Sequence, residues 1–237
     1  GRIAVGRATP RDLVALGGSA RQAVALAKLL VDRPAVRGYY DVLIDVSVLG
    51  SLPDREYRAG LAEVVKYGVI LDAEFFAYLE ANVDAINRKD PAALAHIVDR
   101  SCRLKADVVE QDERETTGLR AVLNYGHTFG HAFEALGDYE ALLHGEAIAA
   151  GMRCAIRLAQ RLGRVDDAVV KRHDALLDAL HLTTQPPETD GQELLRLMYR
   201  DKKVAGGRLR FILPDSVGHV ELIDVSEEDV LAALDNS

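Results

Sequence analysis

The stretch Gly118–Glu146 constrains this chain most, because its histidines are spaced as metal ligands often are. His127 and His131 lie four residues apart in a run that can be helical, so they would share one helix face. His144 is expected to open the next helix after a turn and can return to the same place. Neutral imidazole is the commonest transition-metal ligand, and a catalytic zinc has three protein ligands and one open position. The stretch is therefore a candidate metal site.

A polar stripe in the same run allows two interpretations. Arg120, Asn124, His127 and His131 follow one another at the spacing of a single helix face. Two histidines at this spacing are often only part of a polar surface. If the helix is buried, its polar groups need partners, which a metal ion and an anionic, hydroxyl-rich ligand would supply. The residues alone leave both interpretations open.

Composition limits the classes of partner. The 237 residues, 49% of them hydrophobic, can bury one sizeable core or two small ones. The net charge is −8 and no basic stripe is visible, so we expect no nucleic acid partner. Cys102 and Cys154 are the only cysteines, which argues against a disulfide framework or a thiolate metal site. No apolar run could span a bilayer and no signal-peptide pattern begins the chain, so we expect a cytoplasmic protein.

Hydrophobic periodicity predicts a mainly α-helical domain over residues 51–237, preceded by a short, incomplete α/β segment over residues 1–50. In the first segment we expect a strand that ends in a glycine turn at Asp12–Gly18, and a helix at Ala20–Val31. A second strand is expected at Val42–Val46. The helices expected afterwards begin at Ser51, Ala73, Pro91, Glu146, Asp166, Gln192 and Ser226. Arg208–Leu213 and His219–Ile223 alternate as the strands of a small β-hairpin.

Other polar features each have a plain alternative. The turn Gly17-Gly18-Ser19 could bind phosphate at a helix start, or be only a turn. Glu63 and Lys66, three residues apart on a helix, are typical of an exposed salt bridge. Lys105, beside an apolar stripe, either extends to solvent or meets an anion. The remaining histidines are interpreted as surface or ordinary structural residues: His96, His173, His181 and His219.

Several long motifs follow one another from Val42 to the C-terminus. They are Leu52-Pro53, AGLAEVVKYG (Ala59–Gly68), LKADVV (Leu104–Val109), DERETTGLRAVLNYGHTFGHAFE (Asp112–Glu134), LHGEAIAAGM (Leu143–Met152), DKK (Asp201–Lys203) and FILP (Phe211–Pro214). In this order they resemble the C-terminal part of the 3-dehydroquinate synthases, which are sugar-phosphate cyclases of the shikimate pathway.

The resemblance implies a reaction. The family converts 3-deoxy-D-arabino-heptulosonate 7-phosphate to 3-dehydroquinate and phosphate, using NAD and Zn²⁺ or Co²⁺. The substrate's alcohol is oxidised, phosphate is eliminated, the hydride is returned, and the ring opens and closes again by aldol addition. A metal with two neutral imidazoles and one carboxylate can polarise the alcohol and the carbonyl.

The resemblance also implies residue roles. The metal ligands would be Glu63, His127 and His144, which makes Glu63 more than a salt-bridge partner. His131 would contact the substrate and assist proton transfer. The positions that hold the carboxylate, hydroxyls or phosphate of the substrate are Lys66, Lys105, Arg120 and Asn124. Further active-site positions are Glu115 and Lys203, and those that contact NAD are Val48, Leu49, Gly50 and Ser51.

One departure from the family pattern lies at the front of the chain. The family carries a complete NAD-binding α/β domain before LIDVSVLGSLP, with a longer glycine-rich loop and a GGK segment, and residues 1–41 contain neither. We therefore expect this chain alone to bind NAD hardly at all. The incomplete front segment would leave unpaired strand edges and exposed apolar surface, so we expect it to be poorly ordered or covered by the second subunit of a homodimer. The alternatives are another sugar-phosphate cyclase, such as 2-deoxy-scyllo-inosose synthase, or a non-catalytic metal-binding helical domain.

Overall fold

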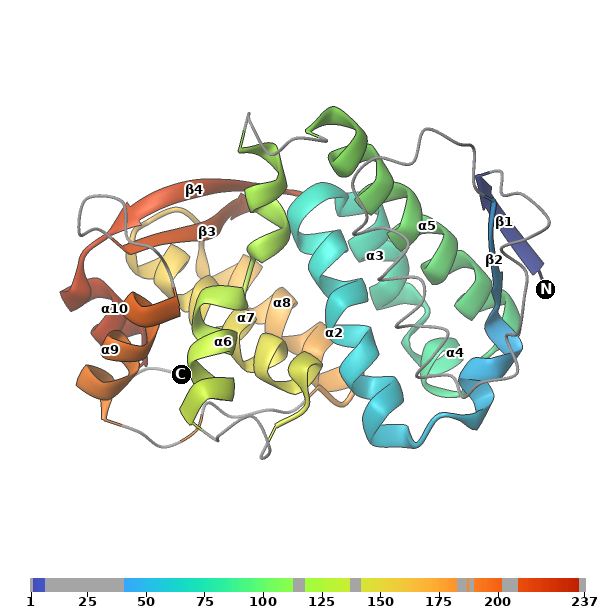
Figure 1. Cartoon of the computed structure of the whole chain (residues 1–237), viewed down its shortest axis with the longest axis horizontal. Helices are drawn as coiled ribbons and strands as arrows, with labels where there is room; N and C mark the ends of the chain where they lie inside the picture. The colour runs from blue at the N-terminus through green and yellow to red at the C-terminus, as the bar shows by residue number, and fades with distance from the viewer. Residues whose placement is uncertain are drawn as a thin grey trace.

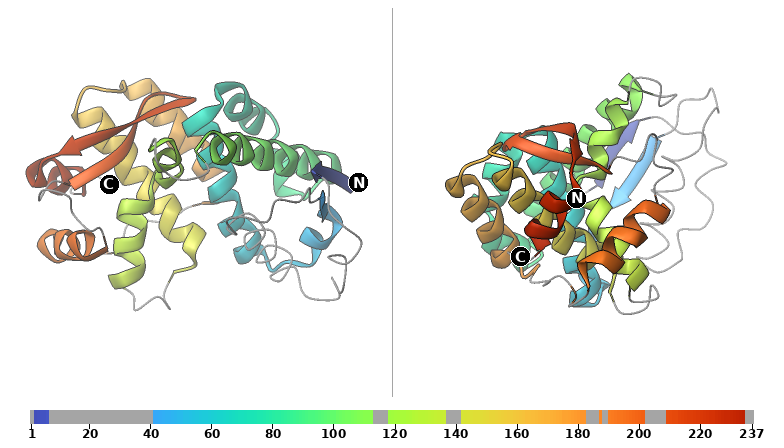
Figure 2. Two further views of the ribbon diagram at one scale, coloured as in Figure 1. Left: turned by 45° about the horizontal axis from the view of Figure 1, so that its top comes forward. Right: turned by 90° about the vertical axis from the view of Figure 1, so that its left-hand side faces the viewer.

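The structure, a computed structural model, describes residues 2–6, 41–112, 118–136, 142–182, 187, 190–201 and 209–234. These residues form a mainly helical body with one pair of antiparallel strands near each end (Figures 1 and 2). The mainly helical fold with a small hairpin is thereby confirmed. The predicted strand, turn and helix over residues 12–31 lie outside the described residues, as do Glu115 and Lys203.

The elements are labelled as in Figure 1, in chain order. The strands and 3-10 helices are β1 (Arg2–Gly6), β2 (Asp41–Asp45), η1 (Val46–Ser51), η2 (Leu119–Asn124), β3 (Leu209–Ser216) and β4 (His219–Val225). The α-helices are α2 (Asp54–Leu71), α3 (Ala73–Ala81), α4 (Val83–Asn87), α5 (Pro91–Gln111), α6 (His127–Leu136), α7 (His144–Arg161), α8 (Asp167–Ala179), α9 (Gly191–Asp201) and α10 (Glu227–Leu234).

The strand predicted at Val42–Val46 exists as β2 and pairs antiparallel with β1. It leads directly into η1, whose first turn is capped by Asp45, because that carboxylate accepts a hydrogen bond of 3.0 Å from the backbone N–H of Ser47. Both β1 and η1 contact α5. The division of the chain near residue 50 stays a prediction.

Sequence signals explain where several helices begin. Asp72, Asp90 and Asp166 each cap a helix by accepting hydrogen bonds from backbone N–H groups of its first turn. Pro91 follows Asp90 at the first position of α5, where a missing N–H is harmless. None of the helices in the described part of the chain is long and apolar enough to cross a bilayer.

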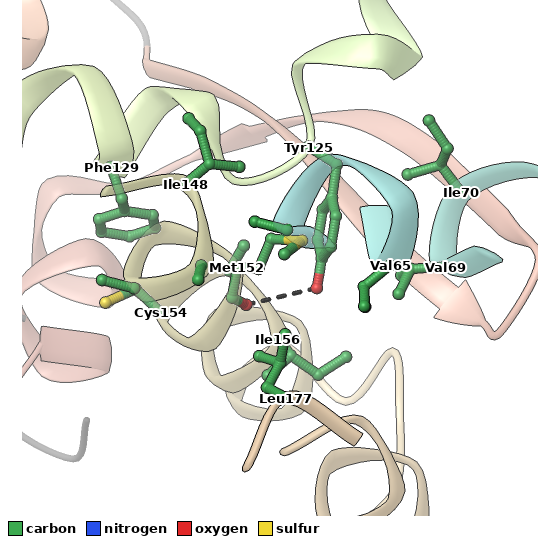
Figure 3. Close-up of a cluster of buried hydrophobic side chains, with 14 of the residues drawn as sticks. Val65, Val69, Ile70, Tyr125, Phe129, Ile148, Met152, Cys154, Ile156 and Leu177 are labelled. Carbon is green, nitrogen blue, oxygen red and sulfur yellow. Dashed lines mark hydrogen bonds between the residues drawn. The ribbon is translucent and has the colours of Figure 1, made fainter. Parts of the chain in front are cut away.

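Helix α7 is the centre of the core and contacts α2, α6, α8, α10 and β3. Its glycines allow close approach to neighbouring backbone. A Cβ atom added at Gly151 would lie 2.1 Å from the carbonyl oxygen of Gly126, and one at Gly145 would lie 1.8 Å from that of Ala59. Figure 3 shows the apolar cluster between these helices, with the ring of Tyr125 at its middle. The packing fixes α7 against both α2 and α6.

The hairpin of β3 and β4 confirms the predicted change of period, with Leu209 paired to Val225 at its open end. Its turn residue Gly218 has φ +94° and donates its N–H to the carbonyl of Val69 on α2, at 2.8 Å. Glycine suits this position because an L side chain is strained at such a φ, and an added Cβ would lie 2.7 Å from the nitrogen of Ala73. The hairpin is therefore tied to the end of α2.

One local prediction is wrong. The polar stripe was expected along a single helix, but the chain forms the short 3-10 helix η2, a break at Tyr125 and Gly126, and then α6. Gly126 has φ +77°, which a right-handed helix cannot contain, and an added Cβ there would lie 3.0 Å from the carbonyl oxygen of Ile148. The close approach of α7 therefore ends the run that periodicity alone would continue.

Candidate metal centre

Three side chains from three helices converge on one place. Glu63 lies in the middle of α2, whereas His127 is the first residue of α6 and His144 is the first residue of α7. One ligand atom from each lies within 4.8 Å of the other two. Both histidines therefore stand at helix starts, next to the close packing of α2, α6 and α7 described above. The sequence prediction that these residues meet agrees with this geometry.

The two carboxylate oxygens of Glu63 have different surroundings. Oε2 accepts a hydrogen bond from Nζ of Lys66 at 2.6 Å. Oε1 is buried without a hydrogen-bond partner among the described residues, and lies 3.7 Å from Nε2 of His127. A buried carboxylate oxygen without a partner is unfavourable, so a cation beside Oε1 would satisfy it. This orphaned oxygen shows that the residues fit a metal ion.

The charges around Glu63 keep it ionised. Burial alone would raise the pKa of its carboxyl, but the charge of the Lys66 ammonium and its hydrogen bond outweigh burial and lower that pKa. Lys66 itself is only 3% exposed, so the prediction of an exposed salt bridge is wrong. The ammonium is instead enclosed beside the cluster, 5.3 Å from the centre of the Tyr67 ring.

His127 is oriented by the backbone. Its Nδ1 lies 3.0 Å from the carbonyl oxygen of Tyr125, so Nδ1–H donates there and the lone pair of Nε2 is directed towards Glu63. Burial, and next the charge of Lys66, lower the pKa of His127 to about 4. The imidazole is therefore neutral near pH 7, as a metal ligand must be.

His144 is oriented by a side chain instead. Its Nδ1 lies 3.0 Å from Oε1 of Glu134, which leaves Nε2 as the other coordinating nitrogen. A carboxylate behind a metal-binding imidazole is the usual outer-shell arrangement, since it fixes the tautomer and raises ligand basicity. The side chain of His144 is 41% exposed, against 14% for His127.

The structure brings His131 to the same place. Its ring centre lies 5.4 Å from that of His127 and 6.2 Å from that of His144. It lies one turn along α6 from His127, on the face that the spacing predicted. His131 is not one of the three residues whose candidate ligand atoms lie within 4.8 Å of one another, so it stands beside this cluster.

The other predicted site residues lie on neighbouring elements. Arg120 and Asn124 belong to η2, which contacts both α2 and α5, the helix of Lys105. The backbone N–H of Arg120 donates to Oδ2 of the buried Asp112 at 3.3 Å, which fixes the start of η2. The four residues predicted to contact NAD form most of η1, where the hydroxyl of Ser51 donates to the carbonyl of Val48.

Sequence reasoning missed the groups that orient the ligands. Glu134 lies seven residues after His127 on α6, and this spacing could have placed it on the same face. Glu146 was also missed. It accepts the N–H of Leu143 at 2.8 Å and a bidentate pair of hydrogen bonds from Arg55, so it ties the start of α7 to α2.

Comparison with known proteins identifies the family. A family model described as 3-dehydroquinate synthase C-terminal matches residues 60–204, which include the whole metal cluster. The chain belongs to the 3-dehydroquinate synthase family. The resemblance read from the sequence motifs is thereby confirmed, and the match begins on α2 and continues beyond α9.

Curated family members are closely similar over most of this chain. The 3-dehydroquinate synthase of Idiomarina loihiensis is 48% identical over 193 residues, which are 81% of this chain and 54% of that protein. The 3-dehydroquinate synthase of Halorhodospira halophila is 56% identical over 177 residues, 75% of this chain and 50% of that protein. The chain thus spans about half the length of the curated relatives it matches.

Solved structures of other cyclases share the fold. One is 2-epi-5-epi-valiolone synthase from Streptomyces hygroscopicus, with NAD⁺ and Zn²⁺ bound. Its TM-score to this chain is 0.74 and its sequence identity is 27%, and the match covers 81% of this chain and 54% of the valiolone synthase chain. The other is 2-deoxy-scyllo-inosose synthase with carbaglucose-6-phosphate, NAD⁺ and Co²⁺: its TM-score is 0.70 and its identity 27%, over 81% of this chain and 55% of that one.

Proposed function

We propose that this chain supplies the metal- and substrate-binding part of a zinc- and NAD-dependent 3-dehydroquinate synthase, which forms 3-dehydroquinate and phosphate from 3-deoxy-D-arabino-heptulosonate 7-phosphate. The observation that carries the proposal is the orphaned Oε1 of Glu63 beside two imidazoles in a chain of this family. The Zn²⁺ and Co²⁺ of the two cyclase structures support a divalent metal at such a site.

Glu63, His127 and His144 would hold the metal, since they offer one carboxylate oxygen and two neutral nitrogens. A metal bound there supplies Lewis-acid polarisation of an alcohol or carbonyl oxygen. The residues behind the ligands fix their direction, through the carbonyl of Tyr125 for His127 and the carboxylate of Glu134 for His144. In this proposal Glu63 binds through Oε1, because Oε2 is held by Lys66.

His131 is the residue we assign to proton transfer. Its ring lies next to both histidine ligands without completing the ligand set, so it can hold or release a proton at a substrate oxygen near the metal. An imidazole suits this role because its two ring nitrogens can accept and donate a proton. Replacing it should reduce turnover and leave metal content near normal.

The cationic residues around the cluster would bind the anionic groups of the substrate. Lys66 is enclosed next to Glu63, while Arg120 and Lys105 come from η2 and α5. A guanidinium offers two parallel donors that match a carboxylate, and Asn124 can pair with hydroxyls. Glu115 and Lys203 keep their proposed active-site roles.

The cofactor and assembly proposals concern the N-terminal side. We propose that η1 contacts NAD through Val48–Ser51, together with a nucleotide-binding part that precedes it in the assembled enzyme. We also keep the proposal that residues 1–50 form a separate α/β part and that two copies associate. Sedimentation equilibrium of the purified chain would test the homodimer.

A phosphate-release assay tests the proposed reaction. The chain would be incubated with the heptulosonate phosphate, NAD and Zn²⁺, alone and after fusion to the N-terminal half of the Halorhodospira halophila relative. We expect little release by the chain alone and clear release by the fusion. His131→Ala in the fusion should keep its zinc and lose most turnover. A fusion that binds zinc and NAD but releases no phosphate would contradict the proposal.

A second cyclase activity is the alternative, favoured by the similarity to 2-deoxy-scyllo-inosose synthase. Binding separates the two, because the substrates differ in their carboxylate. We expect the zinc-loaded fusion to bind the heptulosonate phosphate at least tenfold more tightly than carbaglucose-6-phosphate, and Arg120→Ala to remove most of that preference, since one carboxylate contact contributes about 1.4 kcal/mol or more. The reverse order of affinities would support the alternative.

A further inference from the structure

A continuous line of polar contacts runs from the metal cluster into the core. The carbonyl of Tyr125 accepts from Nδ1 of His127 at 3.0 Å. The phenol oxygen of the same Tyr125 lies 3.3 Å from Nε2 of His173 on α8, whose Nδ1 lies 3.0 Å from Oδ1 of Asp174. Arg157 pairs with the other carboxylate oxygen of Asp174 at 2.9 Å. The line therefore joins α6 to α8 through the middle of the protein.

The inner members of this line are enclosed. Tyr125 is 0% exposed and His173 is 1% exposed. Figure 3 shows the phenol oxygen among apolar side chains, beside the backbone of Met152 on α7, whose carbonyl oxygen lies 3.3 Å away. A polar group buried in this way has a large effect on local geometry, because losing its partner leaves it unsatisfied.

The protonation states give the line a direction. Burial alone would raise the pKa of Asp174, but the hydrogen bond to His173 and the charges of Arg157 and Arg153 lower it, so Asp174 is a carboxylate that only accepts. Burial lowers the pKa of His173, so the imidazole is neutral. Its Nδ1–H then donates to Asp174, and its Nε2 shares the one hydroxyl proton of Tyr125 with the carbonyl oxygen of Met152, each acceptor lying 3.3 Å from the phenol oxygen. The tautomer of His173 thus favours one position of the phenol.

Tyr125 lies in the break between two helices. It follows the last residue of η2 and precedes α6 by two positions, and its φ and ψ of −56° and 129° are extended. Its carbonyl therefore belongs to no helical ladder, whereas its N–H donates to the carbonyl of Val122 at 3.3 Å and its side chain is buried in the core.

We propose that His173 is a positioning residue for the metal centre: by holding the phenol of Tyr125, it fixes the carbonyl that orients His127. The inference rests on the proposed metal-binding function. It gives a role to a histidine that the sequence places on an ordinary amphipathic helix, and it explains why this histidine is buried beside an otherwise apolar core, next to the partly buried Asp174.

The test compares zinc affinities of the whole chain and its variants, measured by competition with a chromophoric chelator. His173→Leu and Tyr125→Phe each remove one end of the contact between these two side chains, and Tyr125→Phe also removes the hydrogen bond to the carbonyl of Met152. Each should weaken zinc binding about threefold to tenfold, less than the loss of a group in direct contact with a ligand. The double variant should lose no more than the larger single loss, because both changes break one contact. His173→Gln keeps an acceptor and should recover most of the affinity.

A control and a spectroscopic readout separate positioning from general destabilisation. His96→Gln changes an exposed histidine that packs on Tyr78, and should leave zinc affinity at the parental value. Imidazole ¹H–¹⁵N correlation spectra of the metal-free protein should show His127 with its proton on Nδ1 in the parent and in His173→Gln. In His173→Leu the same spectra should show a mixture of tautomers.

The outcomes distinguish this inference from the proposed function. A parent that binds no zinc overturns the metal site and this inference together. A parent that binds zinc, with folded His173→Leu and Tyr125→Phe at parental affinity and an unchanged His127 tautomer, overturns this inference alone. If His173→Leu does not fold, Tyr125→Phe and Asp174→Asn should show the same loss of zinc affinity instead. Losses that add up when two of these substitutions are combined would also contradict the role of His173.

Discussion

The two histidines of the candidate metal centre are held by different parts of the molecule. His127 lies largely inside, and its ring bonds to a backbone carbonyl that belongs to the packed core. His144 lies at the surface, and its ring bonds to the side chain of Glu134, which can be exchanged by mutation. The first is therefore fixed by folding itself, whereas the second depends on a few polar contacts at the start of α7.

This difference suggests how the site combines stability with access. In the proposed function, the buried His127 would define where a metal is held, and the exposed His144 would lie on the side that substrate can reach. Changes in the packing under α7 should affect fold and metal together. Changes in the polar contacts of Glu134 and Glu146 should affect the metal with little effect on the fold.

The largest effect is expected from the packing of α7 on α2. In Gly145→Ala the added Cβ would lie 1.8 Å from the carbonyl oxygen of Ala59, so the helices must separate beside His144 and one turn from Glu63. We expect the free energy of unfolding to fall by about 3 kcal/mol, with zinc affinity lost as well, as measured by urea unfolding and chelator competition.

Gly60→Ala is the matched control on α2, because an added Cβ there meets no atom within 4 Å. It should raise the free energy of unfolding by about 0.5 kcal/mol, since alanine restricts the unfolded chain more than glycine does. If Gly145→Ala unfolds at the same urea concentration as the parent, the close contact between the two helices is not as described.

The second effect is a pH dependence that belongs to the buried ligand. The pKa of His127 falls from 6.5 to about 4 in the folded protein, so between these values the unfolded chain binds a proton that the folded chain does not. Stability of the metal-free protein should therefore decrease as pH falls from about 6.5 to about 4, by up to about 3 kcal/mol from this group.

Urea unfolding in the presence of a chelator measures this slope. His127→Gln should reduce it, because one titrating group is gone while the buried His173 remains. His144→Gln should keep it, because the buried His127 is unchanged. If the unfolding free energy changes with pH equally in His127→Gln and the parent, the buried imidazole is not the cause of the pH dependence. The two histidines would then not differ in their effect on stability against pH.

A smaller effect is expected at the exposed ligand. Glu134→Gln replaces the carboxylate behind His144 by an amide of the same shape, which no longer fixes the imidazole tautomer through a charge. Zinc affinity should fall about tenfold, and the visible absorption of the Co²⁺-loaded protein should change. An unchanged affinity would mean that His144 needs no orienting partner.

The smallest effect is expected at the surface pair that ties α7 to α2. Arg55 is 59% exposed, so its bidentate contact with Glu146 is well screened by water and salt. Arg55→Gln should weaken zinc binding only about twofold to threefold, and 1 M NaCl should reproduce part of that change in the parent. A tenfold loss of zinc affinity in Arg55→Gln would contradict this expectation, because it would show that the pair of Arg55 and Glu146 is needed to hold the metal ligands in place.

The sequence allowed the helical body, the hairpin and the candidate ligand set to be predicted, because periodicity and long motifs carry that information. The break at Gly126 could not be predicted, since it results from the close approach of α7, a contact between residues far apart in sequence. The enclosure of Lys66 was missed for the same reason, because i, i+3 spacing does not show what covers the pair. His173 looked ordinary on its own helix, and only its contact with Tyr125 distinguishes it.

Metal content of the parent and four variants tests the central claim most directly. Chelator-treated protein would be reconstituted with Zn²⁺, passed over a desalting column and measured by elemental analysis. The account predicts about one zinc per chain for the parent and for His131→Ala, and less than about a tenth of that for Glu63→Gln, His127→Gln and His144→Gln, since a site with three protein ligands binds weakly once one is removed. A parent without zinc, or a His144→Gln variant that keeps a full equivalent while His131→Ala loses it, would contradict the assignment.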